Sequence, residues 1–600
     1  MALPLEDYAL LGDTYTAALV GRDGSIDWLC LPRFDSDACF AALLGGPEHG
    51  RWLLAPSGDH QAARRTYRGD SLVLETTFDT PDGSVRVVDC MPIGHGGRVD
   101  MVRRVEGLAG RVPMHTELIP RFEFGQAIPW LRAEDGRIVA IAGPNTVYFD
   151  GPVGPDDVRD GTVAREFTVS AGDTVDFHLV WCDLRQAAPQ VIDPTKAIDA
   201  TEQWWQKWAD RNTYEGSYRP AVIRSLLTLK ALTYHPSGGI VAAPTSSLPE
   251  YLGGVRNWDY RYCWIRDATF TLLTLVDNGY KDEAVAWREW LVRAVAGSPD
   301  QMQIMYGVAG ERRLTEVELD WLPGYEDSTP VRVGNAAADQ FQLDVYGELM
   351  DALHQARRRG IEPDPDAWRI QRELMDFLES KWQEPDEGIW EIRGPRRDFT
   401  HSKVMSWVAA DRAVRAVTRF GLDGPADRWR RLRDDIFNEV CEKGYDPDRR
   451  TFTQYYGSTA LDASLLMIPL VGFLPAQDPR VVGTIEAIER DLTHDGFVLR
   501  YDTGDENVDG LPPGEGAFLA CTFWLAEAHA LIGNTQHARR IFESVCDLAN
   551  DVGLLAEEYD VNHRRLVGNF PQALSHLQLV DAAAELAAPP KMPHPRAQED

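Results

Sequence analysis

The pattern of apolar and polar residues changes its period once along the chain. Up to about residue 190, short runs of alternating character are separated by turn signals. Ser71–Phe78 and Thr174–Trp181 are such runs, and Arg22-Asp23-Gly24 and Pro81-Asp82-Gly83 are such turns. Many short strands joined by regular turns are typical of a β-sandwich. The pattern therefore predicts an N-terminal β-sandwich over residues 1–190.

After about residue 196 the apolar residues recur at the helical spacing of 3.6. Residues 191–215 contain one helix, which we interpret as a linker, and residues 589–600 are Pro-rich and polar, as in a disordered tail. Long and short connections alternate between the other predicted helices, and the long ones carry aromatic and acidic clusters. This favours six helical hairpins closed into a ring, with function in loops at one end. The twelve predicted helices of residues 216–588 lie near 217–234, 266–279, 282–297, 336–358, 365–380, 400–419, 424–442, 459–470, 478–490, 515–531, 535–550 and 570–587.

Charge and cysteine usage narrow the possible partners and compartment. The chain has 600 residues and a formal net charge of −32, which argues against nucleic acid or an anionic membrane as a partner. The N-terminus lacks a signal-peptide pattern, and no apolar run is long enough to cross a bilayer. Eight scattered cysteines without a CxxC pair predict reduced thiols in a cytoplasmic protein. No metal or cofactor motif is present, so we predict neither, and the sequence leaves the oligomeric state open.

The segment from Arg256 to Asp267 carries the densest chemistry in the chain. Its twelve residues include two Trp, two Tyr, three Arg and two Asp. Flat rings can hold the apolar face of a sugar, and Arg and Asp can bind its hydroxyls with forked hydrogen bonds. A buried structural ion pair beside packed aromatics fits the composition equally well. Asp267 also lies where the next helix is expected to begin, so it could cap that helix.

Two other loops supply candidate catalytic carboxylates. Glu391 follows Trp390 in a loop, where desolvation could raise its pKa enough for a general acid, although an exposed loop carboxylate is the commoner case. Glu557 and Glu558 lie before the last helix, where one of them could be a general base. Alternatively, they cap that helix or pair with Arg564 or Arg565, which follow in the sequence.

Two weaker candidates lie near residue 500. Arg500 could bind a hydroxyl, and Glu515 could line the site or cap its helix. Two separated carboxylates together with an aromatic, Arg and Asp group indicate glycoside hydrolysis, because that reaction needs one acid and one carboxylate on opposite faces of the sugar.

These motifs together resemble glycoside hydrolase family 15, which contains glucoamylases, glucodextranases and bacterial trehalases. The runs Asp7–Asp13 and Gly21–Ser36 resemble the trehalase-like N-terminal β domain of the bacterial members. The remainder resembles the (α/α)6 barrel of the family, which agrees with twelve predicted helices. The resemblance thus covers nearly the whole chain.

The resemblance also implies roles for individual residues. Glu391 matches the general acid of the family, and Glu557 matches the general base, so Glu557 is preferred over Glu558 by resemblance alone. The residues that match substrate-contacting positions are Tyr260, Trp264, Arg266, Asp267, Trp390, Arg500 and Tyr559.

The implied activity is an inverting hydrolysis that releases β-glucose from a non-reducing end. An α,α-trehalase is the preferred hypothesis, and a glucoamylase-type enzyme for short malto- or isomalto-oligosaccharides is the alternative. A glycoside phosphorylase would need an anion cradle where this sequence has the carboxylate of Glu557. A non-catalytic sugar-binding protein would need neither Glu391 nor Glu557.

Overall fold

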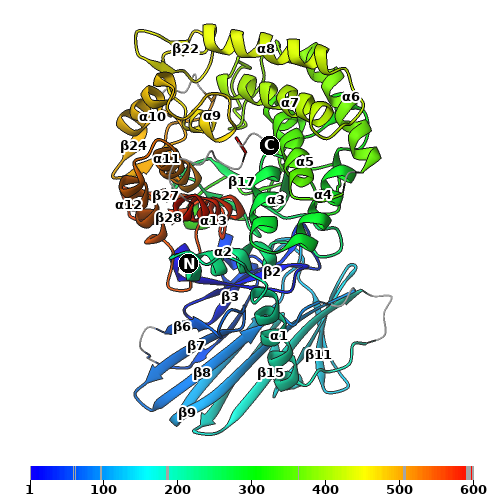
Figure 1. Ribbon diagram of the computed structural model, residues 1–600. Helices are drawn as coiled ribbons and strands as arrows, with labels where there is room; N and C mark the ends of the chain where they lie inside the picture. The colour runs from blue at the N-terminus through cyan, green and yellow to red at the C-terminus, as the bar shows by residue number, and fades with distance from the viewer. Residues whose placement is uncertain are drawn as a thin grey trace.

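The long N-terminal strands lie at one end of the molecule and most helices at the other, with short strands among the helices (Figure 1). The computed structural model describes residues 2–58, 60, 63–94, 97–183, 188–362, 364–504, 509–588 and 596–597. The N-terminal part is rich in strands and the C-terminal part is helical, which confirms the division predicted from the change of period.

The N-terminal strands all connect through one long strand, β9 (Arg98–Ile119). Its first part, residues 98–110, pairs with β8 and β15, and its second part, residues 111–119, pairs with β5 and β14. The other strands of this region are β1 (Tyr8–Gly12), β2 (Ala17–Gly21), β3 (Ser25–Cys30), β4 (Ala38–Phe40), β5 (Arg51–Pro56), β6 (Arg64–Tyr67), β7 (Leu74–Thr80), β8 (Gly83–Cys90), β10 (Trp130–Glu134), β11 (Arg137–Ala142), β12 (Asn145–Asp150), β13 (Val158–Arg159), β14 (Thr162–Ser170) and β15 (Thr174–Asp183).

We call the strands paired with the first part of β9 one branch of the sheet and those paired with its second part the other branch. Side chains from these two branches meet in a common core. The ring of Trp52 on β5 contacts that of Phe149 on β12 edge-on, with centroids 5.3 Å apart. Arg103 of β9 is completely buried there and donates hydrogen bonds to Asp89 and to the carbonyl oxygens of Trp52 and Gly24. Because a buried guanidinium must have all its donors satisfied, Arg103 fixes both branches around itself.

The helices of the C-terminal part form a closed series of contacts. Six inner helices contact one another in the order α3, α5, α7, α9, α11 and α13, and α13 closes the series by contacting α3. The arrangement in Figure 1 agrees with this order. Helices α2, α4, α6, α8, α10 and α12 pack outside them. The bounds are α1 (Pro194–Ala209), α2 (Arg219–Ala231), α3 (Ala268–Asp277), α4 (Lys281–Val295), α5 (Asp344–Arg358), α6 (Pro365–Lys381), α7 (Thr400–Thr418), α8 (Ala426–Lys443), α9 (Met467–Leu470), α10 (Pro479–Leu492), α11 (Leu519–Leu531), α12 (Thr535–Cys546) and α13 (Ala573–Ala587).

Two of the predicted helices are shorter than their apolar pattern. The segment predicted over 336–358 divides into a 3-10 turn, Ala336–Asp339, and α5. The backbone N–H groups of Phe341 and Leu343 donate to the carboxylates of Glu387 and Asp386 on another loop, so they are not available to continue a helix. The segment predicted over 459–470 is likewise a 3-10 turn, Ala463–Leu466, followed by the short α9.

Hydrogen bonds join the strand-rich part to the helical part. The indole of Trp28 donates to the carbonyl oxygen of Pro244 at 2.7 Å. The hydroxyl of Tyr325 donates to the carbonyl oxygen of Leu3 at 2.9 Å. Most of the predicted tail, 589–600, lies outside the described residues, but Arg596 is described and lies buried against Glu348 of α5, with 2.9 Å between Nη2 and Oε2.

All eight cysteines belong to the described residues and none is in a disulfide. No helix within the described ranges is both long and apolar enough to span a membrane.

Candidate active site

The candidate residues gather where loops lead into the N-terminal ends of the inner helices. Arg266 and Asp267 directly precede α3, Glu391 precedes α7, and Glu557 precedes α13. The small strands β16 (Ser246–Pro249), β17 (Asn257–Asp259), β18 (Cys263–Trp264), β26 (Ala517–Phe518), β27 (Glu558–Asp560) and β28 (Arg565–Val567) hold these loops together. The candidate residues thus lie in loops before inner helices, and that these loops carry the function stays a prediction.

The segment from Arg256 to Asp267 contains a buried ion pair and also contributes side chains to the cavity. Asp259 and Arg261 form a completely buried ion pair at 2.7 Å, and Arg261 also donates to the carbonyl oxygen of Ser36 in the strand-rich part. Tyr260 lines the cavity instead, and the ring of Trp264 packs against it with centroids 5.0 Å apart. Neighbouring side chains of this segment thus lie in different surroundings.

Glu391 is held by two donors from that segment. The indole Nε1 of Trp264 donates to Glu391 Oε1 at 2.6 Å, and Arg266 Nη1 donates to the same oxygen at 3.3 Å. Glu391 has a positive φ of 57°, which is uncommon for a residue other than glycine and suggests a functional constraint. The carboxylate is therefore fixed in place while part of its side chain stays accessible, with 16% of it exposed.

The neighbouring Trp390 forms a wall of the same cavity. Its indole donates to Asp462 at 2.9 Å, and its ring packs against Phe518 with centroids 5.6 Å apart. The guanidinium of Arg500 lies over the ring at 5.6 Å. A Trp whose N–H is satisfied presents a fixed apolar face, as a sugar platform requires.

Glu557 is completely buried on the other side of Tyr260. One carboxylate oxygen accepts a hydrogen bond from the backbone N–H of Asn569 at 3.1 Å. Burial, followed by the charge of Glu250, raises the pKa of Glu557 to about 8, although Tyr260 and Arg500 act in the opposite direction. The pKa of Tyr260 is itself raised, first by burial and then by the charges of Glu557, Glu250 and Glu391. The Tyr260 hydroxyl thus lies among three carboxylates.

Behind Glu557, several acidic side chains surround Arg500. Its guanidinium Nη2 lies 2.8 Å from Glu250, 2.6 Å from Glu515 and 3.7 Å from Glu558. All four side chains are buried, and the pKa of Glu558 is raised well above its ordinary value by burial and by the charge of Glu250. A second guanidinium, that of Arg256, lies 3.7 Å from Glu515, so two cations face three buried carboxylates besides Glu557. The raised pKa of Glu558 indicates that this group retains a proton.

Oxygen atoms of Glu250, Glu515 and Glu558 lie within 4.8 Å of one another, as metal ligands would. The Arg500 guanidinium contacts all three carboxylates, so a cation already stands where a metal ion would be held. We assign no metal to this group.

Comparison with known proteins identifies the family. The profile of glycosyl hydrolases family 15 matches residues 216–584, and that of the trehalase-like N-terminal domain matches residues 1–154.

The chain belongs to glycosyl hydrolase family 15.

Relatives of this family 15 chain extend over almost its whole length. A trehalase of Thermoplasma acidophilum is 36% identical over 583 residues, which are 95% of this chain and 98% of the relative. A trehalase of Mycolicibacterium smegmatis is 38% identical over 97% of this chain and 91% of the relative. In structure, the chain is similar to a bacterial glucoamylase complexed with acarbose, with a TM-score of 0.70 at 12% identity over 99% of this chain and 96% of that one. The family makes this protein a glycoside hydrolase, and the structural likeness shows a shared fold.

The residues predicted for this family 15 site do not all reach the cavity. Glu557, Asp267 and Trp264 are not among its lining residues. Glu557 acts on Tyr260, Asp267 accepts from Arg266 at 3.2 Å, and Trp264 donates to Glu391. Tyr559 lies elsewhere: its ring packs against Phe497 with centroids 5.1 Å apart. The lining residues are Glu250, Arg256, Trp258, Tyr260, Arg266, Trp390, Glu391, Ile392, Arg393, Arg500, Tyr501, Asp509, Leu511 and Phe518.

Three alternatives considered from the sequence differ from the structure. Glu557 and Glu558 do not cap α13, whose N-cap residue is Gln572, and Arg565 pairs with Glu326 instead. Asp267 precedes α3 but makes no side-chain capping hydrogen bond, because its carboxylate is turned toward Arg266. Glu515 caps no helix, since α11 begins only at Leu519, and it pairs with Arg500.

Glu250 and Asp509 are site residues that the sequence reasoning missed. Glu250 directly follows the buried strand β16, and a carboxylate at the end of a buried run is the one signal that could have revealed it. Asp509 accepts from Arg256 at 2.6 Å and from the Tyr501 hydroxyl at 2.8 Å. Nothing in its local sequence distinguishes Asp509 from other loop carboxylates.

Proposed function

We propose that this protein is an α,α-trehalase that hydrolyses its substrate with inversion of the anomeric carbon. The observation that carries the proposal is that relatives named trehalase align with 95% or more of this chain at 36–38% identity. The candidate site agrees, since two carboxylates approach one aromatic and Arg-lined cavity from different loops.

For the architecture, we propose an N-terminal β-sandwich over residues 1–190 and an (α/α)6 barrel over residues 216–588. The two branches of strands that share β9, and the closed contacts of the inner helices, support this proposal. Helix α1 would then be the linker of residues 191–215. Eight unpaired thiols are compatible with a reducing compartment, and we propose the cytoplasm.

In the proposed mechanism, Glu391 is the general acid and Glu557 the general base. Glu391 would protonate the glycosidic oxygen while Trp264 and Arg266 keep its carboxylate oriented. Glu557 would accept a proton from the water that attacks the opposite face of the sugar ring. Tyr260 and Trp390 would hold the apolar face of the glucose, and Arg266 would bind its hydroxyls.

The general base must be ionised before it can act. The carboxylates around Arg500 retain a proton, and we propose that it resides on Glu558, the pKa of which is raised well above its ordinary value. This leaves Glu557 free to ionise, with the hydrogen bonds from Asn569 and Tyr260 stabilising its charge.

The stereochemistry of the products tests the mechanism. Inversion at one anomeric centre of α,α-trehalose releases equal amounts of α- and β-glucose, because the leaving glucose keeps its α configuration. Proton NMR within the first turnovers should therefore show both anomers equally. Release of α-glucose alone would demonstrate retention and refute the proposal.

Glucose release from trehalose, maltose, isomaltose and dextrin, measured side by side, tests the substrate. We expect trehalose to have the highest kcat/KM, and a preference for maltose or isomaltose would support the glucoamylase-type alternative instead. The Glu391→Gln and Glu557→Gln variants should each lose about 10²–10⁴-fold in kcat. The Tyr559→Phe variant is the matched control, since Tyr559 lies away from the cavity against Phe497.

A further inference from the structure

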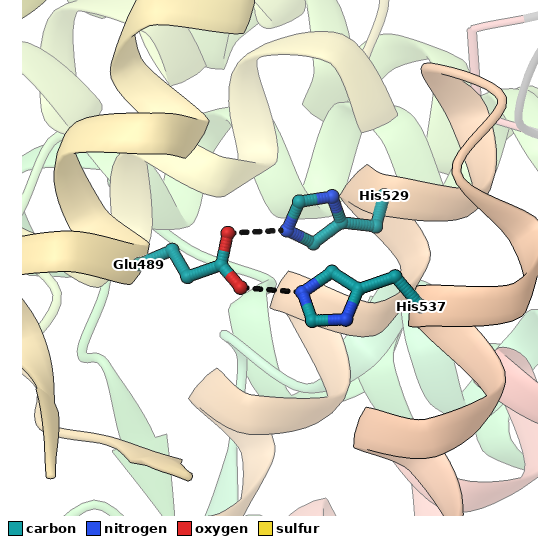
Figure 2. A group of neighbouring side chains, drawn as sticks. All are labelled: Glu489, His529 and His537. Atoms are coloured by element: carbon teal, nitrogen blue, oxygen red, sulfur yellow. Dashed lines mark hydrogen bonds and ion pairs between the residues drawn. The ribbon is translucent and has the colours of Figure 1, made fainter.

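Three potential metal ligands meet where the inner helix α11 packs against the outer helices α10 and α12, among residues with no part in the candidate site. Glu489 lies near the end of α10, His529 near the end of α11 and His537 in the first turn of α12. Figure 2 shows the carboxylate of Glu489 facing the two imidazole rings from one side, with each oxygen directed at one ring nitrogen. Their ligand atoms all lie within 4.8 Å of one another.

Both histidines present the same ring atom to the carboxylate. His529 Nε2 lies 3.1 Å from Glu489 Oε2, and His537 Nε2 lies 2.5 Å from Oε1. Two imidazole nitrogens and one carboxylate oxygen are a common donor set for a catalytic or partly solvated Zn²⁺, in which water completes the coordination. His529 is buried whereas a third of the His537 and Glu489 side chains is exposed, so one side remains open to water.

The surroundings fit a bound cation. Metal-bound histidines normally donate their second ring N–H to a neighbouring acceptor. The side-chain amide of Asn534 lies 3.3 Å from His529 Nδ1, and rotation of this amide would offer its oxygen to that N–H. The charge of Glu486, one turn before Glu489, also acts on His529. Arg540 Nη2 lies 3.2 Å from His537 Nδ1. This contact is exposed to solvent, so the Arg540 side chain can turn away into water.

We propose that Glu489, His529 and His537 bind a Zn²⁺ ion that fastens α10 to the hairpin of α11 and α12. The ion would be structural, since none of these residues lines the cavity that holds Glu391. Imidazole favours Zn²⁺ over Mg²⁺, which prefers oxygen ligands and retains its water.

Calorimetric titration of the full-length, EDTA-treated protein with ZnCl₂ tests this site. We expect one equivalent to bind, no comparable binding of Mg²⁺, and an increase of the melting temperature with Zn²⁺. The His537→Ala and Glu489→Gln variants should each bind Zn²⁺ about 10–100-fold more weakly than the parent or weaker still. The Asn534→Ala variant should weaken Zn²⁺ binding within the same range. The control is His494→Ala, which removes an exposed histidine at the end of β24 (Thr493–His494).

Two further measurements guard against a trivial result. His537 is partly exposed, so the metal-free His537→Ala variant should melt like the metal-free parent, and its turnover should be unchanged. Co²⁺ should give the intense visible absorption of a tetrahedral site in the parent but not in the variant. Absence of Zn²⁺ binding, or equal affinity in parent and His537→Ala, would overturn the proposal and leave the group as a metal-free ion pair.

Discussion

The indole Nε1 of Trp264 donates a hydrogen bond to Glu391 Oε1 at 2.6 Å, across 127 residues of sequence. The bond links the aromatic segment to the loop that carries the proposed general acid. The general acid must point at one oxygen of the substrate. A hydrogen bond to its carboxyl group therefore fixes the orientation of that group as well as contributing to its interaction energy. We therefore propose that Trp264 orients Glu391 for its role as general acid.

Replacement of Trp264 by Phe keeps an aromatic face beside Tyr260 but removes the N–H donor. Hydrogen bonds to charged groups contribute about 1.5–3 kcal/mol, so we expect kcat to fall roughly 10–150-fold while KM changes much less. Steady-state kinetics on trehalose measure both constants. Trp290→Phe is the matched control, because its indole donates at 3.1 Å to the carbonyl oxygen of Val308, outside the cavity. An unchanged kcat for Trp264→Phe would exclude a positioning role.

The pH dependence of the free enzyme should reveal the influence of Glu250 on Glu557. Burial and the charge of Glu250 raise the pKa of Glu557 to about 8, and only the ionised form can act as a base. The value of kcat/KM should therefore rise with pH toward that value. Glu250→Gln removes the repelling charge, so the rising limb should move to lower pH by about one unit. A limb that stays in place would show that Glu250 does not tune the base.

The same pKa shift also predicts a trend in stability. The folded state holds the Glu557 proton up to about pH 8, whereas the ordinary value is 4.5. The associated stabilisation is fully present below pH 4.5 and is lost as the pH rises to 8. Thermal unfolding between pH 5 and pH 8 should thus show a smaller decline for Glu557→Gln than for the parent. If thermal stability declined equally in both proteins, a group other than Glu557 would be responsible for the pH dependence.

Gly568 leaves the space that the carboxylate of Glu557 occupies. A Cβ atom at residue 568 would lie 2.6 Å from Glu557 Oε2, and the φ of Gly568 is +74°. Gly568→Ala should therefore displace the proposed base and lower kcat by about 10²-fold, the penalty typical of a shift of about 1 Å in a catalytic group. Gly457→Ala is the control, since Gly457 has a φ of +78° but no atom within 4 Å of the added Cβ. Equal losses in the two variants would point to backbone strain alone.

Arg103 should be essential to the N-terminal strands. It is completely buried with Asp89 and joins both branches of the sheet. Arg103→Met leaves the carboxylate buried without its partner, so we expect a loss of about 3–5 kcal/mol in unfolding free energy. The double variant Arg103→Met/Asp89→Asn should recover part of that loss. Chemical denaturation followed by fluorescence measures both, and a loss below about 1 kcal/mol for the single variant would contradict this role.

The division into a strand-rich and a helical part, and most helix positions, could be predicted from the sequence alone. Apolar spacing of two and of 3.6 residues is a local property, so it is readable without the fold. The exceptions are instructive: the segment 336–358 has a helical pattern, but Asp386 and Glu387 from another loop take the N–H groups of Leu343 and Phe341. Such competition for backbone donors is invisible until distant loops meet.

Which residues of the aromatic segment reach the cavity depends on contacts between distant parts of the chain. The sequence could not choose between an ion pair and a sugar grip for residues 256–267, whereas the fold buries Asp259 and Arg261 as an ion pair and places Tyr260 and Arg266 in the lining of the cavity. Likewise, Glu250 reaches Arg500 only because the chain brings together residues 250 positions apart. Electrostatic coupling depends on distance in space and on burial, which local sequence does not contain.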